Sequence, residues 1–138
     1  MGFKFFKILV GVEIVLLFIQ FWLGMSINLS VKLPLYTALS FSSYSGGTEV
    51  LAHIINGILI LGVAGVILSY GYRLKRPHIS ALSAPGAVFA VVAVATGATF
   101  ALRGQDDSLS LTMAMSFIII YTIYLSQFYL SQRNTKIT

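Results

Sequence analysis

The sequence FFKILVGVEIVLLFIQFWLGMSI occupies residues 5–27 and predicts a helix that crosses a lipid bilayer. An α-helix rises 1.5 Å per residue, so a run of this length can span a hydrocarbon core about 30 Å thick. The run is longer than the apolar part of a secretory signal peptide, and no small-x-small cleavage site is obvious. We therefore expect this helix to be retained in the protein.

Three further apolar runs follow, separated by polar segments, at residues 49–72, 84–102 and 109–130. Thr48 is the expected N-cap of the second run. Pro85 suits the first turn of the third run, where a missing N–H costs nothing, and Asp107 or Ser108 is the expected cap of the fourth. The sequence thus predicts a single domain, an all-α integral membrane bundle of four helices.

The composition agrees with a membrane protein. The chain has 138 residues, of which 57% are hydrophobic and 9% are charged, and its mean hydropathy is +0.90. Soluble domains carry roughly 25% charged residues, so a soluble fold could not bury this much apolar surface. The absence of cysteine excludes disulfides, thiolate metal sites, iron–sulfur clusters and covalently attached c-type haem.

Basic residues gather on one side of a chain that crosses the membrane four times. That side carries Lys4, Lys7, Arg73, Lys75, Arg76, Arg133 and Lys136. The opposite side carries only two basic residues and three acidic ones, namely Lys32, Arg103, Glu49, Asp106 and Asp107. Because short cytoplasmic loops retain Lys and Arg, we expect a multi-pass protein of the cell membrane with both termini in the cytoplasm. Anionic lipid headgroups account for the basic loop, so no nucleic-acid partner is expected.

Small residues recur at helical spacing and predict close helix packing. The third run carries a stripe of them, Gly86, Ala90, Ala93, Gly97 and Ala101, and the second run carries Gly57, Gly62, Ala64 and Gly65. Such faces let helices approach closely in lipid, either inside the bundle, in a homo-oligomer or against other transmembrane subunits. The aromatic residues near the helix ends are those expected of an interfacial belt: Trp22, Tyr70, Tyr72, Tyr121, Tyr124 and Tyr129.

Glu13 and Gln20 lie seven residues apart, and hence on roughly the same face of the first helix. A carboxyl group inside a membrane span is costly and is a candidate proton relay or ion ligand. Alternatively, Glu13 stays protonated, or reaches toward water and pairs with Lys4 or Arg73. Gln20 lies deeper and is expected to make an interhelical hydrogen bond.

His53 is the leading candidate for a cofactor ligand. It lies one helical turn after Glu49, and Gly57 follows one turn later, where a flat ring could approach the helix. Histidine is a common axial ligand of haem iron, and methionine can supply the second ligand, here Met113 or Met115. His53 of a second copy is another candidate second ligand, because His78 lies in the basic loop on the opposite side. The pattern predicts b-type haem, or a quinone, at the outer helix ends.

The two-helix plan, in which Glu49 and His53 open the second helix, resembles half of a haem A synthase, especially the short four-helix archaeal type. That family carries a Glu and a His-Arg pair at the outer start of the second helix, and a second His opens the fourth. In this chain Ile54 follows the histidine, and Thr112, Met113 and Met115 stand near the place of the second one. The resemblance implies a haem-binding membrane protein.

Three functions therefore compete. The first is an accessory or assembly subunit of a respiratory or other membrane redox complex, which docks through small-residue helix faces and contacts haem or quinone at most. The second is a b-type haem protein or haem A synthase-like enzyme with His53 as axial ligand. The third is a proton- or ion-coupled carrier that uses Glu13. We expect the first, and hence no catalytic residue in this chain.

Overall fold

Four long helices make up the computed structural model, which describes residues 2–30, 46–103 and 106–133. They are α1 (Gly2–Ser30), α2 (Gly47–Arg73), α3 (Pro77–Arg103) and α4 (Asp107–Arg133). Each is long and apolar enough to cross a membrane. The prediction of an all-α bundle of four such helices is confirmed.

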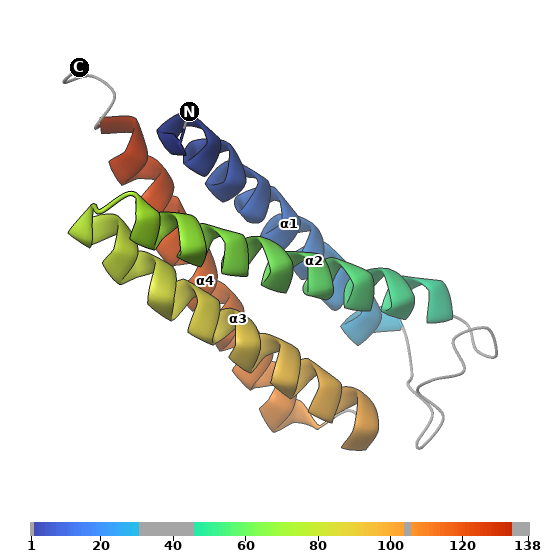
Figure 1. Ribbon diagram of the computed structural model, residues 1–138. Helices are drawn as coiled ribbons and strands as arrows, with labels where there is room; N and C mark the ends of the chain where they lie inside the picture. The colour runs from blue at the N-terminus through green and yellow to red at the C-terminus, as the bar shows by residue number, and fades with distance from the viewer. Residues whose placement is uncertain (1, 31–45, 104–105, 134–138) are drawn as a thin grey trace.

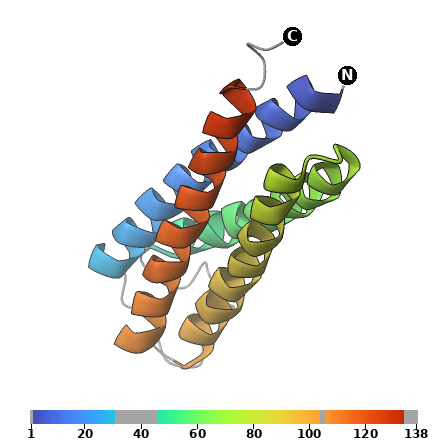
Figure 2. The same ribbon diagram turned by 90° about the vertical axis from the view of Figure 1, so that its left-hand side faces the viewer.

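Each helix packs on the next one along the chain, and α4 also packs on α1. Neighbouring helices run in opposite directions, so Gly2 and Arg133 lie at the same end of the bundle as the α2–α3 turn (Figures 1 and 2). The diagonal pairs, α1 with α3 and α2 with α4, make no such packing contact among the described residues. Toward the opposite end, α2 diverges from α3 (Figure 1).

The end that holds Gly2, Arg133 and the α2–α3 turn is named here the basic end. Its described cations are Lys4, Lys7, Arg73, Lys75, Arg76 and Arg133. The Arg76 guanidinium lies 4.4 Å from the centroid of the Phe3 ring, and Lys7 Nζ donates to Gln132 Oε1 at 3.3 Å. The opposite, acidic end holds Glu49, Asp106 and Asp107. Of the charges used in the orientation argument, Lys32, Lys136 and the Arg103 side chain lie outside what the structure describes.

The start of α3 corrects one predicted boundary. Three helices begin and end within three residues of the predicted limits, but α3 begins at Pro77 rather than near residue 84, so Pro85 lies inside the helix. The extra turns are helical because they pack on α2. Ile79 and Ser83 are fully buried, and Ser80 Oγ donates to the Gly71 carbonyl at 2.9 Å. A Cβ atom at residue 71 would lie 2.5 Å from Ser83 Oγ, so this close approach requires glycine.

Two predicted helix caps are also wrong. Gly46, not Thr48, is the N-cap of α2, and its φ of 89° is a backbone conformation that glycine adopts without strain. The Thr48 hydroxyl instead donates to Glu49 Oε2 at 2.9 Å. At α4 the cap is Asp106 rather than Asp107 or Ser108, because Asp106 Oδ1 accepts the Ser108 backbone N–H at 2.8 Å.

The small-residue stripe of α3 packs against α4. A Cβ atom at Gly86 would lie 3.1 Å from the Tyr124 ring, and one at Gly97 would lie 3.4 Å from Met113 Sδ. The stripe therefore serves packing within this chain. On α2, by contrast, a Cβ atom at Gly62 or Gly65 would meet nothing within 4 Å. That part of α2 faces outward from the described bundle.

Candidate functional site

Polar side chains inside the bundle form two clusters at different depths. The histidine cluster, between α1 and α2, consists of Gln20, His53 and Asn56. The glutamate cluster lies nearer the basic end and consists of Glu13, Ser83, Tyr124 and Gln127, all with 0% exposure. Polar groups inside a membrane span are functional candidates because desolvating them is costly.

The histidine cluster is a chain of three side chains joined by hydrogen bonds. The Asn56 amide nitrogen donates to the Leu16 carbonyl at 2.9 Å and to Gln20 Oε1 at 2.8 Å. Gln20 Nε2 in turn lies 3.0 Å from His53 Nε2. The interhelical hydrogen bond expected of Gln20 is therefore present.

The direction of these bonds fixes the proton on the His53 ring. The Leu16 carbonyl can only accept, so the Asn56 atom that faces it is the NH₂ nitrogen. The Gln20 atom bonded to that nitrogen must be its oxygen, which turns the Gln20 NH₂ group toward the ring. His53 Nε2 is thus the acceptor, and the neutral ring carries its proton on Nδ1.

His53 Nδ1 is buried and has no hydrogen-bond partner among the residues that the structure describes. The ring lies against α1, because a Cβ atom at Gly24 would lie 3.2 Å from His53 Cε1. Gly57, one turn further along α2, would bring a Cβ atom 3.4 Å from Gln20 Nε2. The sequence suggested that Gly57 leaves room for a flat ring. In the structure it leaves room for the Gln20 amide instead. The arrangement leaves one N–H donor, on Nδ1, free to bind an acceptor.

The residues grouped with His53 for haem ligation make other contacts or are exposed. Glu49 is exposed and is bonded to Thr48. Met113 packs at Gly97 between α3 and α4, and Met115 is 51% exposed. The Nε2 lone pair of His53 already accepts from Gln20, so it is not free for iron. Among the described residues no group of three His, Cys, Asp or Glu could hold a metal ion. With the His53 Nε2 lone pair occupied, this geometry does not favour haem.

Glu13 is fully buried inside the bundle. Neither of its carboxyl oxygens has a hydrogen-bond partner within the described helices, so Glu13 does not pair with Lys4 or Arg73. Tyr124 of α4 interacts electrostatically with Glu13, and its buried hydroxyl has no hydrogen-bond partner among the described residues. Gly86 makes room for this ring on the α3 side.

Gln127 extends the glutamate cluster toward α3. Its Nε2 atom donates to the Ile79 carbonyl at 3.1 Å and to Ser83 Oγ at 2.7 Å. The Ile79 carbonyl can only accept, so the Gln127 atom that faces it is the amide nitrogen. The amide oxygen, Oε1, therefore points away from Ile79, and it is buried without a partner among the described residues. Glu13, Tyr124 and Gln127 thus offer buried oxygen atoms that no described group satisfies.

The sequence analysis did not single out four of the cluster residues, namely Asn56, Ser83, Tyr124 and Gln127. Tyr124 was assigned to the interfacial belt, but its side chain has 0% exposure. A usable signal was present, since Tyr124, Gln127 and Ser131 are spaced by three and four residues and so share one face of α4. A polar stripe on an apolar helix indicates a face turned toward protein.

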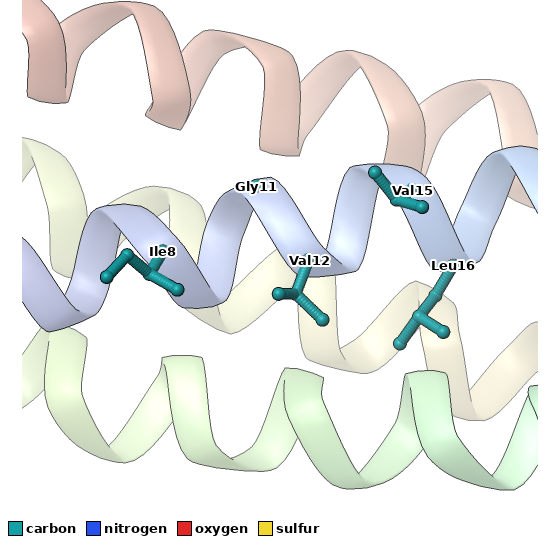
Figure 3. A pocket seen from close by; sticks show the side chains of 5 residues that line it. All are labelled: Ile8, Gly11, Val12, Val15 and Leu16. Atoms are coloured by element: carbon teal, nitrogen blue, oxygen red, sulfur yellow. The ribbon is translucent and has the colours of Figure 1, made fainter.

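The surface of α1 carries an open depression lined only by apolar residues and Gly11 (Figure 3). The residues that line it are Ile8, Gly11, Val12, Val15 and Leu16. Glu13 does not line it, although it follows Val12 in the sequence. A depression without polar groups suits a lipid chain and brings no chemistry of its own.

Comparison with known proteins gives no assignment: no protein-family model, no curated protein and no solved structure matches this chain. The resemblance to haem A synthases remains a prediction from the sequence.

Proposed function

We propose that this chain is a small integral membrane subunit of a membrane redox complex, in which the histidine cluster binds a quinone. The observation that carries the proposal is the buried Nδ1–H of His53, a hydrogen-bond donor without a partner. Buried donors are ordinarily satisfied, so an unpaired one suits a ligand that brings an acceptor.

The chemistry of the donor favours quinone over haem. A quinone is an uncharged ring that dissolves in hydrocarbon, and its carbonyl oxygens accept hydrogen bonds. Iron requires a nitrogen lone pair, whereas the lone pair of this ring accepts from Gln20. His53 lies six residues past Gly47, or ~9 Å along α2, a depth that a lipid-soluble ligand reaches from the bilayer.

Gly24 leaves space for a ligand to approach the His53 ring. A side chain there would lie against His53 Cε1, so glycine leaves the Nδ1 edge of the ring next to bare α1 backbone. The quinone head group would enter between this part of α1 and α2, with its carbonyl oxygen on Nδ1–H. Gln20 and Asn56 hold the ring in the donor tautomer and are positioning residues.

Trp22 provides the test, because it is the single tryptophan and lies two residues from both Gln20 and Gly24. Short-chain benzoquinone and naphthoquinone should quench its fluorescence saturably in the purified chain. His53→Phe should remove the saturable part, whereas His78→Phe, the matched change at the other histidine, should keep it. Equal quenching in both variants, or a Soret band that depends on His53, would overturn the proposal.

The partner subunits would pack on the outward face of α2. Gly62 and Gly65 support this because they present bare backbone on a membrane-spanning helix, a surface that suits close helix packing. Gly62→Leu with Gly65→Leu should release the chain from its complex on native electrophoresis of solubilised membranes. Ala98→Leu, an exposed small residue of α3, is the control and should leave the complex intact. An unchanged complex in the glycine variant would contradict this docking face.

A further inference from the structure

Glu13 is the one acidic side chain inside the membrane-spanning part of the described bundle, and no cation faces it. Residues 54–69 of α2 and 79–102 of α3 contain no titratable side chain. From α4, residues 108–128 contribute only two such groups, Tyr121 and Tyr124. An unpaired charge in this surrounding is strongly disfavoured, whereas a neutral carboxylic acid can be accommodated.

From this placement we propose that Glu13 is a proton-binding site that exchanges with water at the basic end of the bundle. The carboxylate takes up one proton and becomes a neutral acid, and it returns the proton by the same path. This inference is independent of the quinone proposal, because it uses none of the histidine cluster.

The ligand is a proton rather than a metal cation because of the donor set. The site has a single carboxylate, and no three acidic, histidine or cysteine side chains come together among the described residues. Divalent ions such as Ca²⁺ take six to eight oxygen ligands, usually with several carboxylates. A proton needs one oxygen, and the unpartnered Glu13 oxygens supply it.

The path to the basic end follows the polar face of α4. Tyr124, Gln127 and Ser131 are all fully buried and are spaced by three and four residues, so they form a stripe that leads from Glu13 toward Arg133. Lys7, at the basic end, is six residues before Glu13 on α1, or ~9 Å along the axis. In the proposed path a proton crosses this short distance along these hydroxyl and amide groups.

The path toward the acidic end is closed by apolar packing. Leu17 of α1, Ala90 of α3 and Ile120 of α4 belong to the buried core, with exposures of 2%, 1% and 2%. Each lies one helical turn toward the acidic end from a residue at the site: Leu17 from Glu13, Ala90 from Gly86 and Ile120 from Tyr124. Phe6, Val10 and Ile67 are buried on the side of the basic end too, but there the polar stripe of α4 runs beside them, so the proposed access is from that side.

Dicyclohexylcarbodiimide tests this inference because it modifies carboxyl groups in apolar surroundings only when they are protonated. The full-length chain is reconstituted in vesicles, and the label on Glu13 is measured by mass spectrometry. A single cysteine at position 75 reports which way the basic end points, since the chain has no other cysteine. The pH is then changed on one side of the membrane at a time.

We expect Glu13 to be labelled and the label to fall when pH is raised on the side of the basic end. Glu13→Gln should lose the label entirely. Gln127→Leu with Ser131→Ala should remove the response to that side, whereas Ser116→Ala, a buried serine of α4 toward the acidic end, should keep it. Sodium ions should not protect against labelling.

Three results would overturn the inference. Glu13 could remain unlabelled at every pH, its label could follow the pH at the acidic end, or Na⁺ could protect it as an ion ligand. If the Gln127 and Ser131 variant responds like the unchanged chain, the proposed path along α4 is wrong.

Discussion

Gln20 Nε2 and His53 Nε2 face each other at 3.0 Å across the α1–α2 interface, and this contact assigns the ring proton to the far nitrogen. The assignment depends on Asn56, which is held by a backbone carbonyl that can only accept. The Leu16 carbonyl of α1 thereby determines that His53 of α2 carries its N–H donor on Nδ1.

Asn56→Leu should destabilise the bundle by about 1–2 kcal/mol, because it removes two hydrogen bonds between α1 and α2 and leaves Gln20 Oε1 without its donor. Equilibrium unfolding in mixed detergent micelles measures the effect. Asn28→Leu, at an exposed position of α1, is the control and should change stability little. Equal effects of the two substitutions would contradict the network.

Gly71→Ala should destabilise the bundle by about 1–3 kcal/mol, since the added methyl group would overlap Ser83 Oγ. Ser83 cannot move freely, because its hydroxyl donates to Ile79 and accepts from Gln127. Gly65→Ala is the control, because a methyl group at residue 65 would meet no atom within 4 Å. It should be neutral or slightly stabilising. The same unfolding measurement distinguishes them, and a harmless Gly71→Ala would refute the close α2–α3 approach.

The beginning of α3 illustrates what the sequence alone could not predict. Residues 77–83 are polar enough to suggest a loop, and they are helical because Ile79 and Ser83 are buried against α2. That burial depends on Gly71, which lies on another helix and permits the close approach. The four apolar runs were sufficient to predict the helices, since a membrane span requires a long uninterrupted apolar run.

The candidate site was predictable only in part, for a similar reason. Glu13, Gln20 and His53 stand out as polar residues in apolar runs, and each was identified from the sequence. Their partners depend on how neighbouring helices are aligned, which the periodicity of one helix does not determine. Tyr124 therefore looked like a belt residue, and the contact between His53 and Gln20 could not be foreseen.

Glu13→Met should stabilise the bundle, by about 1–3 kcal/mol, because it removes a buried carboxyl group whose oxygens have no partner. The substitution keeps the length of the side chain and adds no polar group. Unfolding in detergent again provides the measurement, with Leu17→Met as a control for introducing methionine into the core. A loss of stability beyond that of the control would mean that Glu13 has partners that stabilise it.

The two ends of the bundle should lie on opposite sides of the membrane, with the basic end in the cytoplasm. Lys75→Cys and Asp106→Cys place single cysteines at the basic and acidic ends of a chain without native cysteine. In intact cells an impermeant maleimide should label position 106 and leave position 75 unlabelled. Labelling of both positions, or of position 75 alone, would refute this orientation.

The ¹⁵N NMR spectrum of His53 in the bilayer-reconstituted chain, recorded with and without quinone, tests the central claim most directly. We predict a neutral ring protonated on Nδ1, with the Nδ1 resonance shifting as quinone is added while Nε2 continues to accept from Gln20. A proton on Nε2, or an Nδ1 signal indifferent to quinone, would contradict the account.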